Sequence, residues 1–182
     1  LTVIFALMMN EVHNMKFKRI SQTITYLPHF LSWIVVGNFV FQILSPTYGI
    51  VNAVLLKLGV LQEPIYFMVQ KNMFTPIYLV TNIWKSLGWS IIIYLASIAG
   101  IDPGLYEAAA IDGAGRFRKA LHVTLPGIMP TISTLLILQM GSLINVGFDP
   151  IFNLYTDATY EVADVISTYV YRRGLVNAKY SY

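Results

Sequence analysis

The chain has 182 residues, of which 56% are hydrophobic and 12% are charged, whereas roughly 25% of the residues of an average soluble domain are charged. This composition is typical of a membrane protein. The formal net charge of +3 is small, and no basic cluster is interleaved with aromatic residues, so nucleic acid is excluded as a partner. Cysteine is absent, which excludes disulfides, thiolate metal sites and cysteine nucleophiles.

The chain opens with an apolar segment that is too short to cross a bilayer. Residues 1–9 supply about half of the roughly 20 residues that a spanning helix needs. No basic region precedes this segment and no small-residue cleavage site follows it, so it is not a signal peptide. We expect it to be part of a span in a longer polypeptide that has further spans beyond both ends of this sequence.

Three longer apolar segments are predicted to be complete spans. Residues 20–44 and 123–148 are stretches of 25 and 26 residues without a formal charge, long enough for a hydrocarbon core of about 30 Å. Residues 77–101 form the other span, which contains a single charge, Lys85. The sequence therefore predicts an all-α fold, a polytopic bundle of transmembrane helices in one domain over residues 1–182.

The segment between the first two spans is predicted to leave the bilayer. Residues 45–76 contain several prolines and glycines together with Lys57, Glu63 and Lys71. Their apolar piece, residues 50–61, is too short to span and indicates an interfacial helix.

The last segment, residues 149–182, is also predicted to lie in water or at the membrane interface, because it holds seven charged residues. Within it, residues 161–171 have a helical period. That period places four side chains on one face of a predicted helix, Val162, Val165, Ile166 and Tyr169.

The charged segment between the second and third spans has the signals of two short helices. Asp102 is a favourable N-cap, and Pro103 suits the first helical position. The helix-forming residues that follow run to Gly113, which suits a left-handed residue that ends a helix. Residues 114–121 can form a second helix with exposed basic side chains. The sequence predicts a compact helix-turn-helix loop that fits a groove on a soluble partner, although a solvated connector would carry similar charges.

The same segment resembles the EAA loop of the membrane-spanning subunits of bacterial ATP-binding-cassette importers. Glu107, Ala108 and Ala109 lead the pattern, Gly113 follows at the family's distance, and Val123-Thr124-Leu125-Pro126 closes it with valine in place of isoleucine. The chain from residue 10 to residue 182 is also similar to permeases of the carbohydrate-uptake group, especially those for oligosaccharides and polysaccharide fragments.

The resemblance implies a type I importer permease fold in which this loop, residues 102–126, is the cytoplasmic coupling loop. It implies that the loop docks in a cleft of a separate ATPase subunit. The residues that this assigns to docking are Glu107, Ala108, Ala109, Gly113, Arg116, Arg118, Lys119, Leu125 and Pro126.

The resemblance also implies the other partners and the location. These are a pair of ATPase subunits, a second permease subunit, an extracytoplasmic solute-binding protein and the lipid bilayer of the bacterial inner membrane, which the chain crosses several times. No phosphate-binding GxxxxGK[ST] motif occurs, so we expect ATP to be used by the partner and no cofactor to bind this chain. The expected function is uptake of a carbohydrate, without enzymatic activity of its own.

The positive-inside rule gives only weak support for this orientation. The loops on the predicted cytoplasmic side hold six Lys and Arg residues, and the segments 45–76 and 149–182 on the extracytoplasmic side hold five. Compact basic groups near span ends, at residues 16–19 and 116–119, favour the cytoplasm for the first side.

Polar side chains recur at helical spacing in each predicted span. Such stripes either hold helices together or line a path, and a tryptophan beside amide groups is suited to a sugar. Lys85 either extends to the headgroups, pairs with a neighbouring helix, or lines the path. The candidate path residues are Asn38, Gln42, Asn82, Lys85, Trp89, Gln139, Ser142 and Asn145.

Two competing functions are weighed against transport driven by ATP. An ion-coupled secondary carrier usually has acidic groups within the membrane, and no Asp or Glu lies in the three predicted spans. A membrane enzyme lacks a suitable cluster, since His13, His29 and His122 are far apart in the sequence and are interpreted as structural or interfacial. We therefore predict no catalytic residues and no metal site.

Overall fold

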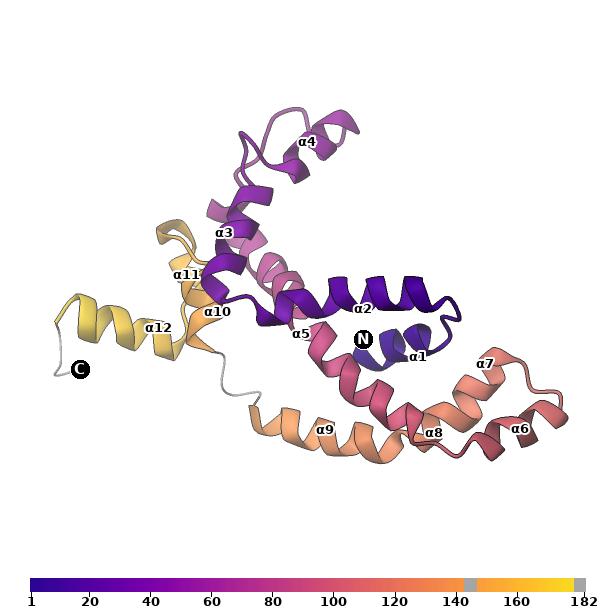
Figure 1. The fold of residues 1–182 in the computed structure, drawn as a ribbon. Helices are drawn as coiled ribbons and strands as arrows, with labels where there is room; N and C mark the ends of the chain where they lie inside the picture. The colour runs from indigo at the N-terminus through magenta and orange to yellow at the C-terminus, as the bar shows by residue number, and fades with distance from the viewer. Residues whose placement is uncertain (143–146, 179–182) are drawn as a thin grey trace. The chain divides into compact units, whose positions relative to one another are not determined.

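The computed structural model describes residues 1–142 and 147–178, and every regular element in these two ranges is helical (Figure 1). In chain order the elements are α1 (Thr2–Asn10), α2 (Met15–Phe30), α3 (Trp33–Ile43), α4 (Ile50–Lys57), the 3-10 turn η1 (Phe67–Val69), α5 (Lys71–Ala99), α6 (Pro103–Ile111), α7 (Arg116–Lys119), the π-helical turn η2 (Ala120–Thr124), α8 (Leu125–Gly127), α9 (Met129–Ser142), α10 (Phe148–Phe152), the 3-10 turn η3 (Asp157–Thr159), α11 (Tyr160–Ala163), α12 (Ile166–Val170) and the π-helical turn η4 (Tyr171–Val176).

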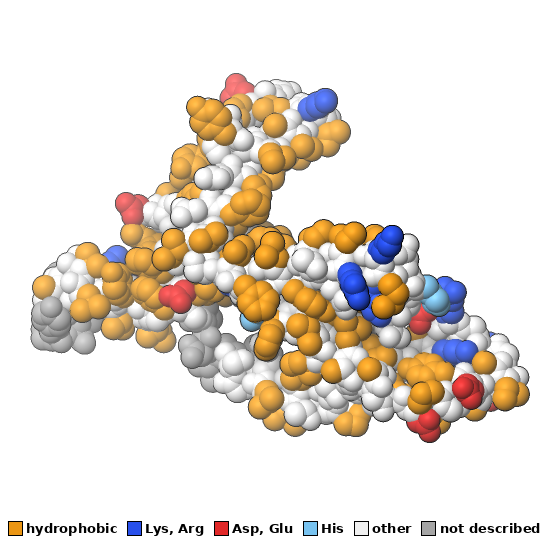
Figure 2. Space-filling view, in the orientation of Figure 1, with side chains coloured by type: hydrophobic (Ala, Val, Ile, Leu, Met, Phe, Trp, Pro, Cys, Tyr) orange, Lys and Arg blue, Asp and Glu red, His pale blue; other side chains and the backbone are white. Residues whose placement is uncertain are grey.

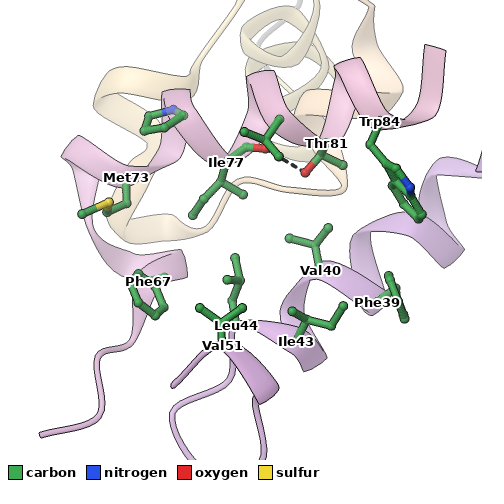
Figure 3. Close-up of a pocket in the computed structure, with 12 residues that line it drawn as sticks. Phe39, Val40, Ile43, Leu44, Val51, Phe67, Met73, Ile77, Thr81 and Trp84 are labelled. Atoms are coloured by element: carbon green, nitrogen blue, oxygen red, sulfur yellow. Dashed lines mark hydrogen bonds between the residues drawn. The ribbon is translucent and has the colours of Figure 1, made fainter. Parts of the chain in front are cut away.

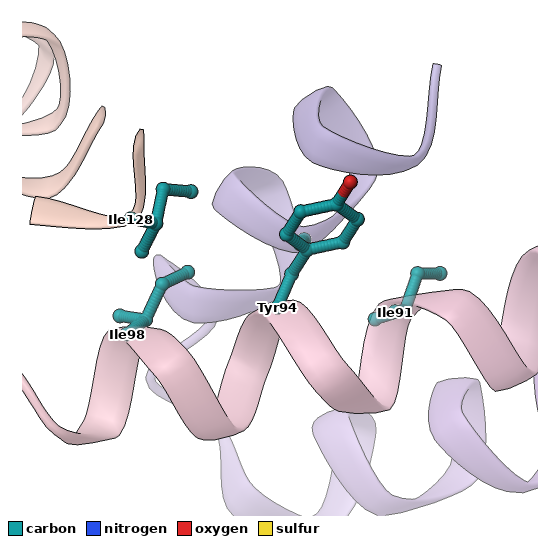
Figure 4. Packing of buried hydrophobic residues seen from close by; sticks show 5 residues of the cluster. Ile91, Tyr94, Ile98 and Ile128 are labelled. Carbon is teal, nitrogen blue, oxygen red and sulfur yellow. The ribbon is translucent and has the colours of Figure 1, made fainter. Parts of the chain in front are cut away.

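The helices form two compact units, one of Leu1–His29 with Lys85–Asn145 and one of Phe30–Trp84 with Val146–Tyr182. The first unit is built on the second half of α5. Ile91, Tyr94 and Ile98 recur along one face of this helix and pack with Ile128 and with Ala6 of α1 (Figure 4). All five are at most 8% exposed.

A glycine sets the closest approach of two helices in the first unit. A Cβ at Gly88 of α5 would meet the backbone of Thr25 and Tyr26 in α2. Small residues allow helix backbones to touch in this way, and van der Waals packing of this kind drives association in membranes. Gly88 therefore fixes where α2 crosses α5.

The second unit has its own apolar core. Its buried members are Met68, Phe74, Ile151, Leu154 and Ala163, which come from η1, α5, α10, the residues after α10, and α11. A Cβ at Gly37 of α3 would collide with the carbonyl oxygen of Asn153, so α3 and the end of α10 also pack backbone to backbone.

A single buried amide organises the connection between α3 and α5 in this unit. The Asn52 side chain is 1% exposed, and its Nδ2 donates to the carbonyl oxygens of Leu44, Ser45 and Ile65 at 3.2, 3.0 and 2.9 Å. Its Oδ1 accepts from the Ile65 amide at 2.8 Å. Helix α4 is thereby tied to the chain on both of its sides.

An apolar cavity of about 500 Å³ lies in the second unit (Figure 3). Side chains of α3, α4, η1 and α5 line it, and Phe39, Val40, Ile77 and Trp84 are among them. Thr81 is the one lining residue with a hydroxyl group, and that hydroxyl donates to the Ile77 carbonyl at 2.7 Å. The cavity thus offers apolar surface and little capacity for hydrogen bonding.

The spans predicted from the sequence correspond to differently divided helices. Residues 20–44 hold the larger part of α2, which begins at Met15, and all of α3, because Ser32 caps α3 by accepting from the Val35 amide at 3.4 Å. The second predicted span is α5, which begins six residues earlier, at Lys71, and includes Pro76. In the third, Arg116–Gly127 and α9 meet at a 59° bend, since Pro130 lacks the amide that would continue the helix.

Among the described residues, α5 alone is long and apolar enough to cross a membrane as an unbroken helix. The pair α2 and α3, and the pair Arg116–Gly127 and α9, reach the same length and hydropathy when each is counted as one span. The described chain therefore holds one such span, or up to three.

The prediction of one amphipathic helix over residues 161–171 was wrong. The helix is interrupted between α11 and α12, where Thr168 Oγ1 accepts from the Val165 amide at 3.0 Å and donates to the Asp164 carboxylate at 2.7 Å. The buried side chains there are Ala163 and Thr168, whereas Ile166 is 84% exposed. Capping by a polar side chain overrides the apolar period, because it satisfies backbone groups at the break.

Charged and aromatic side chains reinforce this break. Arg172 forms an ion pair with Asp164, which raises the pKa of the arginine. Its guanidinium lies 4.4 Å from the ring centroid of Tyr160. A hydrogen bond with Asp157 raises the pKa of Tyr160 to about 12, so the phenol stays protonated near neutral pH.

Candidate functional site

The helix-turn-helix segment begins with the cap that the sequence predicts. Asp102 is the N-cap of α6, and its Oδ1 accepts from the Gly104 amide at 2.9 Å. Pro103 occupies the first turn, where its missing N–H costs nothing. Both predictions are confirmed.

The turn between the two helices is closed by glycine. Gly113 has φ +75°, its amide donates to the Ala110 carbonyl at 3.0 Å, and the Ala114 amide donates to the Ala109 carbonyl at 2.9 Å. These bonds satisfy carbonyls at the end of α6, as a left-handed C-terminal glycine does. The predicted left-handed conformation is confirmed.

The second helix is longer than predicted. Residues 114–121 were expected to form it, but it begins at Arg116 and continues through the π-helical turn η2 to Gly127 in α8. The Tyr106 hydroxyl lies 3.0 Å from the Thr124 hydroxyl and joins α6 to η2. We call residues 102–127 the knob, because they form one hydrogen-bonded hairpin of helices.

The base of the knob is packed against the helices that it connects. A Cβ at Gly127 would lie 2.7 Å from Cδ1 of Ile101, and Ile128 is fully buried in the core of the first unit. The knob therefore has little freedom to move independently of the ends of α5 and α9.

The predicted docking residues lie mostly on the surface of the knob. Ala109, Lys119 and Leu125 are half-buried. The exposed members of the set are Glu107, Ala108, Gly113, Arg116, Arg118 and Pro126. Figure 2 shows basic and acidic side chains at this end of the molecule, at the lower right.

Two further residues of the knob were missed by the sequence analysis. Ile111 is 87% exposed and Phe117 is 83% exposed. Their signal in the sequence is an apolar residue next to charged ones, since Ile111 precedes Asp112 and Phe117 lies between Arg116 and Arg118. The docking pattern gives no role to either position, which is why they were overlooked.

Two of the candidate path residues share a polar pocket in the second unit. Asn38 and Gln42 are one helical turn apart on α3, and both line a hollow of about 390 Å³. The other lining residues are Phe41, Ser45, Pro46, Thr47 and Tyr66. Amide, hydroxyl and aromatic groups thus converge there, in contrast to the apolar cavity beside Thr81.

The candidates on α5 have partners of their own. Asn82 Nδ2 donates to the Tyr78 hydroxyl at 3.2 Å. Lys85 Nζ donates to the carbonyl oxygens of Pro28 and His29, at 3.3 and 3.0 Å, which are among the last carbonyls of α2 and lack helical partners. The Trp89 ring stacks on His29 with centroids 4.8 Å apart. These contacts provide hydrogen-bond acceptors for the Lys85 ammonium and cover one face of the Trp89 indole.

Gln139 and Ser142, near the end of α9, line neither of the two pockets described above. The Ser142 hydroxyl donates to the Gln139 carbonyl at 2.9 Å, and both residues are exposed. Asn145 lies outside the described residues. Within residues 1–142 and 147–178 no group of three or more His, Asp or Glu side chains is arranged to hold a metal ion.

Residues 1–148 match the family model described as "Binding-protein-dependent transport system inner membrane component". This match includes the whole knob. The family is one of membrane transport components, which confirms that the chain is not an enzyme.

Named relatives agree with this match. The polygalacturonan/rhamnogalacturonan transport system permease protein YteP of Bacillus subtilis (strain 168) is 42% identical over 180 residues, which cover 99% of this chain and 56% of that protein. Protein LplB of the same organism is 41% identical with the same coverage. The chain spans about half the length of the curated relatives it matches.

A solved structure of similar fold comes from a bacterial ABC transporter involved in the import of the acidic polysaccharide alginate. It superposes with a TM-score of 0.91 at 47% identity and covers 98% of this chain and 62% of that one. The same transporter in complex with an alginate pentasaccharide-bound periplasmic protein gives a TM-score of 0.90. The predicted all-α fold of a type I importer permease is confirmed. This chain belongs to the family of binding-protein-dependent transport system inner membrane components.

Proposed function

We propose that this chain is part of the membrane-spanning permease of an ATP-driven importer, with an oligosaccharide as its substrate. The knob is the observation that carries the proposal. It is a rigid and largely exposed hairpin of helices whose residues match a docking pattern for an ATPase subunit. A solvated connector would need neither the capped first helix nor the tie between Tyr106 and Thr124.

The proposed coupling is mechanical. ATP binds the partner ATPase pair and not this chain, which needs no cofactor. Closure of that pair displaces the knob, and the packed base at Ile101, Gly127 and Ile128 passes the displacement to α5 and α9. The free energy of ATP binding and hydrolysis then shifts the equilibrium between the outward-open and inward-open conformations.

The remaining partners and the arrangement in the membrane follow from the same proposal. The chain crosses the inner membrane several times, with the knob in the cytoplasm and residues 45–76 and 149–182 on the other side. It works with a second permease subunit and an extracytoplasmic solute-binding protein. The alginate transporter structure with its periplasmic protein supports a binding-protein partner.

The polar pocket supports a carbohydrate as the substrate. Sugars present hydroxyls that pair with amides and faces that pack on aromatic rings, and Asn38, Gln42, Phe41 and Tyr66 offer such groups together. The relatives named for polygalacturonan/rhamnogalacturonan and for alginate support a polysaccharide fragment. We assign the path residues on this basis, namely Asn38, Gln42, Asn82, Lys85, Trp89, Gln139, Ser142 and Asn145.

Purification of the tagged full-length permease from its own cells tests the proposal. We expect a soluble ATPase to co-purify, and proteoliposomes with the complex and its binding protein to take up a labelled oligosaccharide only with ATP. An ATPase-free permease whose uptake follows an ion gradient would indicate a secondary carrier instead. Glu107→Ala is expected to weaken ATPase binding and to uncouple transport while leaving the helical content unchanged.

A further inference from the structure

The two most exposed apolar side chains of the knob lie in charged surroundings. Phe117 and Ile111 are 83% and 87% exposed. Residues 102–119 hold six charged side chains, three acidic and three basic. Apolar exposure is ordinary where a helix faces lipid, but burying this segment in lipid would also bury those charges. The exposed ring therefore requires another explanation.

We propose that Phe117 and Ile111 are the apolar anchors by which the knob binds its ATPase subunit, and that the partner presents an apolar pocket rimmed by carboxylates. This inference rests on the proposed function and names the chemistry of the interface. Aromatic side chains seated in desolvated pockets dominate binding energies, whereas exposed ion pairs contribute little. Glu107 and the basic residues then set orientation and association rate.

The knob is suited to present these anchors at low entropic cost. Phe117 lies on α7, which is continuous with η2 and is joined to α6 by the contact of Tyr106 with Thr124. Ile111 ends α6, and the turn that follows is fixed by the backbone bonds at Gly113 and Ala114. A surface already held in its bound shape loses less conformational freedom on binding.

The charges favour a protein partner, with carboxylates beside Phe117 and basic groups elsewhere, over a membrane surface. Arg116, Arg118 and Lys119 are sequence neighbours of Phe117, and such a basic group would also suit anionic lipid. On the same knob, however, Asp102, Glu107 and Asp112 are exposed, and they would be repelled by such a surface. A structured partner can match both signs, whereas an anionic bilayer matches one.

The experiment measures binding of the purified ATPase subunit that accompanies the wild-type permease. Full-length permease in nanodiscs is titrated with this subunit, and the Kd is compared among variants. We expect Phe117→Ala to weaken binding about 30-fold and Ile111→Ala about tenfold, typical of anchor positions. Phe117→Leu should retain most of the affinity. Glu107→Gln should cost only severalfold, as an exposed ion pair does.

The matched control is Ile166→Ala, because Ile166 is 84% exposed but lies outside the knob, in α12. It should leave the Kd within about twofold, since a truncation outside the knob removes no contact with the ATPase subunit. All variants should unfold at the wild-type temperature, because exposed side chains contribute little to folding.

The outcomes separate this inference from the proposed function. If the wild-type permease binds no ATPase, the proposed function fails. If the wild type binds and Phe117→Ala binds equally well, only the anchor assignment is overturned. The anchor assignment is also overturned if Phe117→Ala weakens binding of the permease to anionic vesicles while ATPase binding persists. That result would assign the ring to lipid. A loss in Glu107→Gln that exceeds the loss in Phe117→Ala would also contradict it.

Discussion

Two connections between helices in this chain are held together in opposite ways. The knob, residues 102–127, is fixed mainly by bonds between near neighbours, such as the Gly104 amide to Asp102 and the Ala114 amide to Ala109, with one longer tie between the hydroxyls of Tyr106 and Thr124. The connection from α3 to α5 is fixed by one buried side chain, Asn52, whose partners are 7 to 13 residues away. The first device leaves a stiff hairpin with its side chains exposed, whereas the second uses a buried polar group to hold the chain.

This difference predicts where each connection is fragile. A hairpin of many local bonds loses little when one side chain is removed, unless that residue sets the backbone of the turn. A connection organised by one amide depends on that amide, because its partners would be left buried without hydrogen bonds. The following variants test or sharpen the contrast, from the largest expected effect to the smallest.

Asn52→Leu should give the largest loss of stability. It removes four hydrogen bonds at a site that is 1% exposed, and we expect a cost on the order of 3 kcal/mol, since each unsatisfied buried group costs about 1–3 kcal/mol. Thermal unfolding in detergent measures it. Asn72→Leu is the control, because Asn72 is exposed on α5 and should change stability by no more than about 0.5 kcal/mol. Equal unfolding temperatures for both variants would show that Asn52 is dispensable.

Gly113→Val should be the costliest single change within the knob. Its φ of +75° is unfavourable for a β-branched residue, and a strained conformation of this kind costs roughly 1–3 kcal/mol. No atom lies within 4 Å of a Cβ there, so the cost is in the backbone alone. Gly113→Asn should therefore be nearly neutral, because asparagine tolerates the left-handed region. The measurement is the affinity of each variant for the ATPase subunit. Equal losses of affinity in both variants would indicate crowding by the new side chain rather than backbone strain.

The sequence predicted the helical fold and the cap and turn of the knob but missed several contacts elsewhere, and both outcomes have one physical reason. A cap at Asp102 and a left-handed Gly113 depend on residues one to five positions away, so the sequence alone contains the argument. The contacts of Asn52, the interruption of the C-terminal helix at Asp164 and the stacking of His29 on Trp89 depend on residues brought together by folding. The apolar period over residues 161–171 had no means of revealing that Thr168 would cap a break.

The path residues show the same limit. Helical spacing placed Asn38 and Gln42 on one face of α3, and the structure adds Tyr66 from a distant turn to the same pocket. For Lys85 the sequence left three roles open, and only the fold supplies its bonds to Pro28 and His29. The exposure of Phe117 and Ile111 likewise emerges only once α6 and α7 are packed on each other.

Gln42→Leu should reduce uptake without affecting the knob. If the pocket of Asn38, Gln42 and Tyr66 contacts sugar, losing one hydrogen bond to a neutral partner should lower transport about fivefold to tenfold, which corresponds to roughly 1 kcal/mol. Uptake and ATPase co-purification are measured on one preparation. Gln62→Leu is the comparison, because Gln62 is exposed, lines neither described pocket and is not one of the assigned path residues. Loss of uptake and of ATPase binding together would indicate misfolding rather than a contact with substrate.

Glu161→Gln should have the smallest effect. Lys71 pairs with Glu161 and holds the pKa of that carboxyl below its ordinary value. A depressed folded-state pKa means that the stabilisation is present above the unfolded pKa and is lost as pH falls through the folded pKa. Both side chains are exposed, so solvent screens the pair. Unfolding temperatures of wild type and variant should differ slightly at neutral pH and converge in acid, and a gap that widens in acid would contradict the ion pair.

The most direct test of the central claim uses the absence of cysteine from this chain. Two single-cysteine variants are made in a full-length permease that is freed of any other cysteine. One carries the cysteine at exposed Ala108 of the knob, and the other at Val60 after α4, which is 66% exposed. Each purified complex is treated with a short bifunctional cross-linker. The account predicts that Ala108→Cys couples to the ATPase subunit and that Val60→Cys does not. Coupling of Val60→Cys to the ATPase, or none from Ala108→Cys in a complex that hydrolyses ATP, would contradict the docking of the knob.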